Sequence, residues 1–235
     1  DHSFEEWGEP LVSAPAVTTE SAISIEETTA NPRGDVTNTG GENPTRYIDY
    51  GTSSGSYPWN KNCGVGGTGV YNSNLTGLSP GTKYYFRARA VNSAGTGTGS
   101  ELSFTTKPNP PTNLSCSVIS QTQINLTWSK GSGAEKTLIR RKVGSYPTSV
   151  TDGDQVYFDT GTSYNDTTCS CGTNYFYRAW SYKTGAPNSG YSDATSDDNA
   201  TTLPCGWTGK ISGVTNPAKI MGVDVANIAK VKGVA

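Results

Sequence analysis

Histidine is almost absent from this sequence, and its scarcity limits the chemistry available to the chain. His2 is the only histidine among 235 residues, and it lies next to the first residue. Ser-His-Asp catalysis and activation of a cysteine nucleophile both need an imidazole held in place by the fold. The five cysteines are irregularly spaced, with no CxxC pair to suggest a zinc site. We therefore expect a protein that is not an enzyme and that has no catalytic residue, metal ion or cofactor.

Long hydrophobic runs are also missing, and charge is sparse. Only 33% of the residues are hydrophobic and 16% are charged, and no run of apolar residues is long enough to span a bilayer. The basic C-terminal stretch is short and has no aromatic residue after Trp207, so it lacks the side chains that stack on bases. We expect neither a membrane span nor a nucleic-acid partner.

The residues that are abundant favour strands and turns. The chain has 28 glycines, 13 prolines and 13 tyrosines, and good helix formers are scarce. Short segments rich in β-branched and aromatic residues end at Gly, Pro, Asn or Asp, as in TRYIDYG (45–51), INLTWS (124–129) and KTLIRRK (136–142). These features predict an all-β fold.

One pattern occurs twice. GTKYYFRA at residues 81–88 matches GTNYFYRA at 172–179, and a Thr-rich segment comes after each copy. The copies are about 90 residues apart, the length of one small β-sandwich. We predict two sandwiches in tandem, connected by the Pro-rich stretch TTKPNPPTNL (105–114).

These stretches, together with GLSPGTKYYFRARAVNSAG (77–95) and INLTW (124–128), resemble the fibronectin type III family over roughly residues 12–203. The resemblance implies two immunoglobulin-like sandwiches, which serve as spacers and binding platforms. It also implies structural core roles for Leu78, Tyr84, Trp128 and Tyr175, with the two tyrosines at the corner turns. The first copy departs from the family because its second strand has no tryptophan.

The resemblance also fixes the expected organisation of the chain. We predict an acidic N-terminal arm at 1–11, a first domain at 12–107, a second domain at 108–204 and a basic aliphatic tail at 205–235. The ends differ in charge: residues 1–32 carry seven acids and no Lys or Arg, whereas residues 206–235 carry four Lys against one Asp. Such ends attract each other in a head-to-tail polymer, although two solvated tails would show the same pattern.

The cysteines leave alternatives open. Cys169 replaces the core leucine of the second copy and Cys171 replaces its proline. A Cys116–Cys169 disulfide fits this placement, and a Cys171–Cys205 disulfide would tie the corner turn to the residues that leave the last strand. In the alternative, Cys116 and Cys169 are reduced core residues. Cys63 remains unpaired or pairs between chains.

The tail repeats one phrase, KISGV (210–214), KIMGV (219–223) and KVKGV (230–234). The recurring Gly and the β-branched residues favour short strands with tight turns, although Asn216-Pro217 is also compatible with a helix start. The phrase is similar to C-terminal repeats of bacteriophage structural proteins. Exposed aliphatic strands associate readily, so we expect an assembly interface formed by Ile211, Val214, Lys219, Ile220, Val223, Val225, Ile228, Lys230, Val231 and Val234.

The expected function is that of an extracellular structural protein. It self-associates or joins other structural proteins of the same assembly, at a virion surface or tail in the favoured hypothesis and in a pilus-like cell-surface filament in the next. A third hypothesis is a module that binds a carbohydrate or a host surface. Its candidate residues are the loop aromatics Tyr57, Trp59 and Tyr146. The tripeptide Arg33-Gly34-Asp35 lies in a predicted strand, which argues against presentation to an adhesion receptor.

Overall fold

The computed structural model describes residues 11–193 and 195–206, and the backbone of residues 210–211, 214–215, 219–220 and 223–224. The described residues form β-strands and one short 3-10 turn, η1 (Asn188–Gly190), so the predicted all-β fold is confirmed. The chain divides into two compact units. The first unit comprises Asp1–Pro108 with Lys183–Gly190, and the second unit comprises Asn109–Tyr182 with Tyr191–Ala235.

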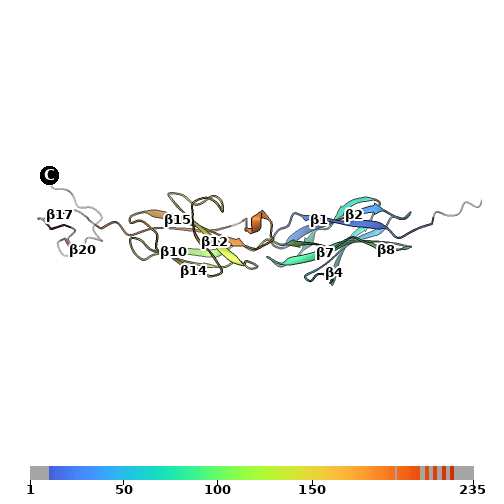
Figure 1. Ribbon diagram of the computed structural model, residues 1–235, viewed down its shortest axis with the longest axis horizontal. Helices are drawn as coiled ribbons and strands as arrows, with labels where there is room; N and C mark the ends of the chain where they lie inside the picture. The colour runs from blue at the N-terminus through green and yellow to red at the C-terminus, as the bar shows by residue number, and fades with distance from the viewer. Residues whose placement is uncertain are drawn as a thin grey trace, which may run out of the picture. The chain divides into compact units, whose positions relative to one another are not determined.

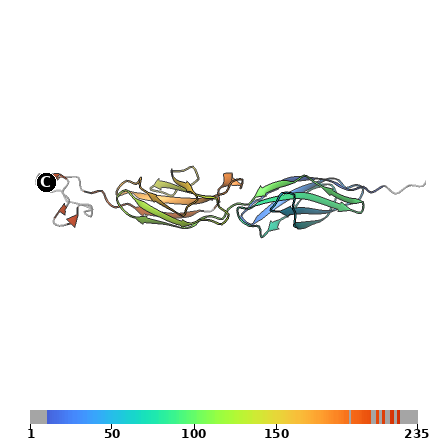
Figure 2. The ribbon, with the colours of Figure 1, turned by 60° about the horizontal axis from the view of Figure 1, so that its bottom comes forward.

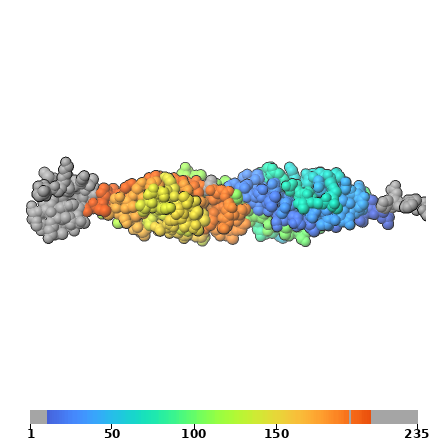
Figure 3. Space-filling model, turned by 90° about the horizontal axis from the view of Figure 1, so that it is seen from above, coloured from blue at the N-terminus to red at the C-terminus, as the bar shows by residue number. Residues whose placement is uncertain are grey.

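The first unit is a sandwich of two antiparallel sheets, visible as two facing layers of strands in Figure 1 and Figure 2. Its strands are β1 (Ala16–Ile23), β2 (Thr29–Asn38), β3 (Thr45–Gly51), β4 (Trp59–Val65), β5 (Gly69–Asn72), β6 (Leu75–Thr76), β7 (Lys83–Asn92), β8 (Gly95–Thr98) and β9 (Leu102–Thr105). One sheet has the order β1-β2-β5, with β6 also paired to β2, and the other has the order β4-β3-β7-β8, with β9 also paired to β7. In the space-filling view of Figure 3, blue and cyan atoms of this unit lie on the same visible face.

Alternation along β7 creates the core of the first unit. Successive side chains of a strand point to opposite faces, so Tyr84, Phe86, Ala88 and Ala90 are all buried. Residues of the facing sheet pack against them, including Val17, Ala30, Val36, Tyr71 and Leu75.

The tripeptide Arg33-Gly34-Asp35 lies within β2, as expected from the sequence. Its glycine faces the interior, where an added Cβ would lie 2.5 Å from Ala88 Cβ. Gly34 is therefore required for close packing of the two sheets, and the tripeptide is not presented on a loop.

The second unit repeats this architecture. Its strands are β10 (Thr112–Val118), β11 (Ile124–Ser129), β12 (Lys136–Val143), β13 (Asp154–Asp159), β14 (Ser163–Asp166), β15 (Asn174–Tyr182) and β16 (Ser196–Thr201). The sheets have the orders β10-β11-β14 and β13-β12-β15-β16. Trp128 is buried at the centre, where its indole N–H donates to Thr137 Oγ1 at 3.2 Å and its ring meets Tyr157 edge-on at 4.9 Å.

The tail contains two minimal hairpins. β17 (Lys210–Ile211) pairs antiparallel with β18 (Val214–Thr215), and β19 (Lys219–Ile220) pairs antiparallel with β20 (Val223–Asp224). The described backbone of the tail is therefore in short strands, the conformation that the recurring Gly and β-branched residues favour over a helix. Hairpins of this length are not stable alone in water. The other expected interface residues lie outside the described residues: Val225, Ile228, Lys230, Val231 and Val234.

The core of the first unit predicts a large cost for truncating Phe86, which has no exposed surface. Phe86→Ala is expected to lower the free energy of unfolding by about 3–5 kcal/mol, because it removes buried surface and leaves a cavity. Urea unfolding followed by circular dichroism measures this loss. Val70, which is 59% exposed, supplies the control: Val70→Ala is expected to cost less than about 1 kcal/mol. Equal losses in the two variants would contradict the assignment of the core.

Candidate functional site

A corner turn precedes β7 in the first unit and β15 in the second, and the same hydrogen bond closes both turns. The backbone N–H of Ser79 donates to the hydroxyl of Tyr84 at 2.9 Å, and that of Ser170 donates to the hydroxyl of Tyr175 at 2.8 Å. Both tyrosines are buried. The structure thus gives the expected corner tyrosines equivalent positions.

A buried threonine completes each corner. Thr106 Oγ1 donates to Ser79 O at 2.7 Å and accepts from Thr82 N–H at 2.9 Å. Thr202 repeats both bonds with Ser170 O at 2.6 Å and Thr173 N–H at 3.0 Å. Positions counted back from the two corner tyrosines can therefore be compared directly between the units.

At the open edge of the first sandwich, β3, β4 and the turn after β6 enclose a cavity of about 280 Å³. We call it the aromatic groove; its lining residues are Tyr50, Trp59, Thr76, Gly77, Leu78 and Tyr84. Tyr50 pairs with Trp59 across the strands, and their ring centroids are 5.6 Å apart. Leu78 and Tyr84 are buried, whereas Trp59 is 46% exposed. The groove therefore joins a core wall to an accessible indole.

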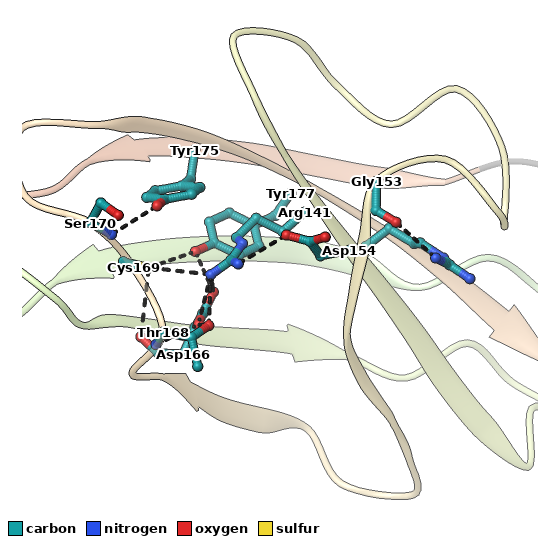
Figure 4. Close-up of polar contacts among 10 residues, drawn as sticks. Arg141, Gly153, Asp154, Asp166, Thr168, Cys169, Ser170, Tyr175 and Tyr177 are labelled. Carbon is teal, nitrogen blue, oxygen red and sulfur yellow. Dashed lines mark hydrogen bonds and ion pairs between the residues drawn. The ribbon is translucent and has the colours of Figure 1, made fainter.

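The second unit has charged side chains at the same place. Arg141 precedes Tyr175 by the same number of residues as Tyr50 precedes Tyr84, and it pairs with Asp154 as Tyr50 pairs with Trp59. By the same count, Asp166, Thr168 and Cys169 correspond to Leu75, Gly77 and Leu78 of the first unit. Figure 4 shows Arg141 between Asp154 and Asp166 with Tyr177 beside it. We call Arg141, Asp154, Asp166, Thr168 and Tyr177 the Arg141 cluster.

The Arg141 cluster satisfies a buried charge pair. The guanidinium Nη1 of Arg141 lies 2.8 Å from Asp166 Oδ2 and 2.9 Å from Thr168 Oγ1, and Nη2 lies 3.1 Å from Asp154 Oδ2. Tyr177 donates its hydroxyl to Asp166 at 2.9 Å. The guanidinium carbon is 4.7 Å from the centroid of the Tyr175 ring, so Arg141 fills the space next to the corner tyrosine.

The environment of Asp166 favours its ionised form. Burial alone would raise the pKa of this fully buried carboxyl, but hydrogen bonds from Thr168 and Tyr177 and the charge of Arg141 outweigh burial. The pKa of Asp166 is therefore lowered below its ordinary value of 3.8. Burial raises the pKa of Tyr177, and the contact with Cys169 and the charge of Asp166 raise it further, so that Tyr177 stays a neutral donor.

Of the two disulfides considered, the structure contains Cys171–Cys205 and not Cys116–Cys169. Cys116 and Cys169 are free thiols. Their sulfurs have other neighbours. Cys169 Sγ lies 3.5 Å from the hydroxyl of Tyr177, and burial raises the pKa of the Cys116 thiol, as does its neighbour Asp198. The reduced alternative thus describes this pair. Cys63 is also a free thiol, half-buried against the core of the first unit.

The Cys171–Cys205 disulfide fixes the point at which the chain leaves the second unit. Its Cα atoms are 4.9 Å apart, and it closes a segment with a sequence separation of 34. Beside it, the N–H of Gly172 donates to Leu203 O at 2.8 Å. The residues after β16 are therefore held against the corner turn by both a covalent bond and a hydrogen bond.

The three aromatic residues expected to bind a ligand differ in how far their side chains are already engaged by contacts within their own unit. Tyr57 donates its hydroxyl to Glu101, and the guanidinium of Arg87 covers its ring at 4.5 Å from the centroid. Tyr146 contacts Phe176 edge-on at 4.9 Å and accepts from the side chain of Asn199 at 2.9 Å. Both tyrosines are occupied by packing within their own unit. Trp59 is the candidate whose side chain lines a cavity.

Sequence reasoning missed the partners of Trp59 and the whole Arg141 cluster. Tyr50 and Arg141 are both on strands that the sequence predicts, and the corner-tyrosine count aligns them. Extending the repeat upstream of the corner would have revealed the exchange of Tyr50 for Arg141. The facing residues Trp59 and Asp154 are harder to find, because the loops before them differ in length.

Two structural signatures, a cluster of metal ligands and a membrane-spanning helix, are absent from the described residues. Among them, no cluster of three His, Cys, Asp or Glu side chains is arranged to hold a metal ion. The same part of the chain has no helix with the length and apolar character needed to cross a bilayer.

No family model matches the chain. Among solved structures, a two-domain fibronectin type III segment of chicken tenascin superimposes with a TM-score of 0.55 at 18% identity, covering 80% of this chain and 99% of that one. The fold is that of two fibronectin type III domains in tandem. The expected tandem architecture is thereby confirmed at the level of fold.

A curated relative gives a sequence match. The receptor-type tyrosine-protein phosphatase eta of Gallus gallus is 32% identical over 107 residues, which are 42% of this chain and 8% of that protein. Because the chain spans so little of the phosphatase, the match carries neither its activity nor its partners to this chain.

The Arg141 cluster predicts a pH-dependent stability. Asp166→Asn is expected to lower the free energy of unfolding of the second unit by about 3–5 kcal/mol at pH 7, because it removes the buried counter-charge of Arg141 and leaves only the exposed carboxylate of Asp154. A carboxyl with a lowered folded-state pKa stabilises the fold above its unfolded-state pKa and loses that effect as the pH falls through its folded-state value. Wild-type stability should therefore fall below about pH 4, and the variant should show a flatter profile in urea unfolding followed by tryptophan fluorescence.

Asp154 is the matched control for Asp166, because it contacts the same guanidinium but its side chain is 74% exposed. Asp154→Asn is expected to cost no more than about 1 kcal/mol. If both variants lose the same stability, or the pH profile of Asp166→Asn remains that of the wild type, the role given to the buried carboxylate is wrong.

The Cys171–Cys205 disulfide is expected to stabilise the second unit independently of the Arg141 cluster. Replacing Cys171 and Cys205 together by Ser is expected to destabilise the second unit by about 3–4 kcal/mol, as estimated for a loop of this length from the entropy of the unfolded chain. Urea unfolding with and without a phosphine reductant measures the change. The reductant should bring the wild type down to the level of the double variant and leave that variant unchanged. A double variant as stable as the oxidised wild type would contradict the prediction.

Proposed function

We propose that this protein is a non-enzymatic extracellular structural module that joins a larger assembly through its C-terminal tail. In this proposal the sandwiches, at 12–107 and 108–204, serve as spacers, and residues 205–235 form the assembly element. The fibronectin type III fold is typical of extracellular and cell-surface proteins, which supports the location. The favoured assembly is a virion surface or tail, and a pilus-like cell-surface filament is the alternative.

One observation supports the proposal: a repeat too short to fold alone begins at Lys210, five residues after the disulfide-bonded Cys205. β17–β20 form hairpins with two residues in each strand, and such hairpins need a partner surface. Cys205 holds the base of the tail to the corner turn. A segment that is anchored at one end and rich in Ile and Val is well suited to add strands to a neighbouring copy or to another structural protein.

Charge supports association between copies. Residues 1–32 carry seven acids without a basic residue, and residues 206–235 carry a net charge of +3. Opposite charges at the two ends increase the rate of encounter and select a head-to-tail orientation. The association is therefore expected to weaken as salt is added.

A carbohydrate-binding or host-binding module is the second candidate function. It is favoured by Trp59, whose accessible indole lines the aromatic groove. A glycan ligand and a structural role are compatible, because the groove lies in the first unit whereas the tail comes after the second.

The assembly proposal is tested by comparing the full chain with a chain that stops after Gly206, which keeps the Cys171–Cys205 disulfide. We expect the full chain to form ordered multimers and the shortened chain to remain monomeric, because only the full chain has the aliphatic repeat. Light scattering gives the mass and negative-stain imaging shows whether the multimers are filaments or closed rings.

A double variant separates the repeat from the mere length of the tail. Ile220→Ser with Val223→Ser replaces two expected interface residues and should reduce assembly at least tenfold in the concentration required. Leu203→Ser changes a residue that is 45% exposed just before the tail and should leave assembly unchanged. Monomers for all four proteins would overturn the proposal.

A further inference from the structure

We propose that the aromatic groove of the first unit binds one pyranose ring of an uncharged glycan. The inference goes beyond the assembly function and is independent of it, since none of the lining residues belongs to the tail. It assigns a ligand class to Tyr50, Trp59 and Thr76, which the sequence pattern alone does not connect.

The groove offers both kinds of contact that a sugar needs. Trp59 and Tyr50 supply ring surfaces, against which the C–H face of a pyranose can stack, and the buried Tyr84, whose ring stacks on Phe104, forms the inner wall. The indole N–H of Trp59, the hydroxyl of Tyr50 and the hydroxyl of Thr76 have no hydrogen-bond partner within the described part of the chain. Small-molecule sites combine apolar walls with a few polar groups in this way. None of the six lining residues is charged, so the ligand is expected to be neutral.

Hydrogen bonding decides between a sugar and an aliphatic occupant. If an Ile or Val side chain from another copy's tail covered the groove, the free groups of Trp59, Tyr50 and Thr76 would lose water and gain no partner. Each buried polar group left unpaired costs stability. The hydroxyls of a pyranose can pair with these groups while its C–H face covers the rings, so the sugar is the better match.

The size and shape of the groove also suit a single ring. Its volume of about 280 Å³ lies just below the usual range for sites of drug-sized ligands, which is about 300–1,000 Å³. Gly77 has φ +71°, and an added Cβ there would point into open space. The absence of a side chain at Gly77 keeps this part of the lining clear, and the buried Leu78 and Tyr84 limit its depth.

In the second unit, side chains of the Arg141 cluster fill the position that corresponds to the aromatic groove. Arg141 fills the position of Tyr50, and Thr168 adds a hydroxyl at the position of Gly77 that bonds to Asp166 at 2.7 Å. Both terminal nitrogens of Arg141 and the hydroxyls of Thr168 and Tyr177 bond within the cluster, whereas the buried Nε of Arg141 has no hydrogen-bond partner. One scaffold position is thus open and aromatic in the first unit and filled by an ion pair in the second. Stability of the sandwich does not by itself require the open form.

The test uses the full chain with its five tryptophans replaced by 5-fluorotryptophan, and fluorine NMR. Trp59→Phe removes one signal and so assigns it. The probes are the methyl glycosides of glucose, galactose, mannose, N-acetylglucosamine and N-acetylgalactosamine, each added up to about 50 mM. We expect at least one of them to shift the Trp59 signal saturably with a Kd on the order of 1 mM, as is reasonable for so small a ligand in a shallow site.

Variants show where the sugar binds. Binding to each variant is measured by saturation-transfer NMR of the sugar, which does not depend on the Trp59 signal. Trp59→Ala should weaken binding at least tenfold, and Thr76→Val, which keeps the shape but removes the hydroxyl, should weaken it several-fold. Tyr146→Ala, at an aromatic residue occupied by Phe176 and Asn199, should leave the Kd unchanged. The chain that stops after Gly206 should bind equally well, so failure of the assembly proposal and failure of this one remain distinguishable.

Several results would overturn the proposal. One is that none of the five glycosides shifts the Trp59 signal. A second is that Thr76→Val and Trp59→Ala, each with an unchanged Trp128 signal that shows a folded core, bind as tightly as the wild type. A third is that only N-acetylneuraminic acid binds, since the groove has no cation for its carboxylate. A saturable shift with a peptide of residues 210–224 and with no sugar would identify the tail as the occupant.

Discussion

A hydrogen bond from a backbone N–H to a buried tyrosine hydroxyl sets the geometry of each unit. Ser79 and Tyr84 form it in the first unit, and Ser170 and Tyr175 form it in the second. Because the tyrosine is buried, its hydroxyl needs a partner, and the turn that supplies one determines where β7 and β15 begin. Once the start of such a strand is fixed, alternation decides which of its side chains face the core.

The same frame tolerates very different chemistry at one edge. In the first unit Tyr50 and Trp59 lie at this edge, and the indole of Trp59 is accessible to solvent. In the second unit Arg141 lies there with Asp154 and Asp166. A buried ion pair is weak support for stability, because desolvation offsets much of its attraction, although removing one partner is costly. The Arg141 cluster is tolerated because Thr168 and Tyr177 satisfy the remaining atoms of Asp166. The edge position can therefore vary without loss of the sandwich.

The sequence was sufficient for the fold and only partly sufficient for the site. The repeated GT-x-Y-x-[FY]-R-A pattern identifies both corners, and the flanking segments predict strands, because alternation and turn residues are local signals. The count from the corner tyrosines aligns Tyr50 with Arg141, but their facing residues Trp59 and Asp154 follow only from the pairing of β3 with β4 and of β12 with β13. Likewise, alternation in the first strand of the second unit directs Cys116 inward, and the match to the core leucine directs Cys169 inward. Only three-dimensional packing decides that their sulfurs contact different groups.

The two copies also differ in the residues that come after the buried threonine. After Thr106 the chain continues into a stretch with Pro108, Pro110 and Pro111, whose rings restrict φ. After Thr202 the chain reaches Cys205, which is bonded to the corner turn. A pull on the residues after Cys205 is therefore transmitted through the disulfide to the turn that precedes β15, and it does not peel β16 from β15 one hydrogen bond at a time. The bond thus protects the final strand of the second unit at the point where the chain leaves it.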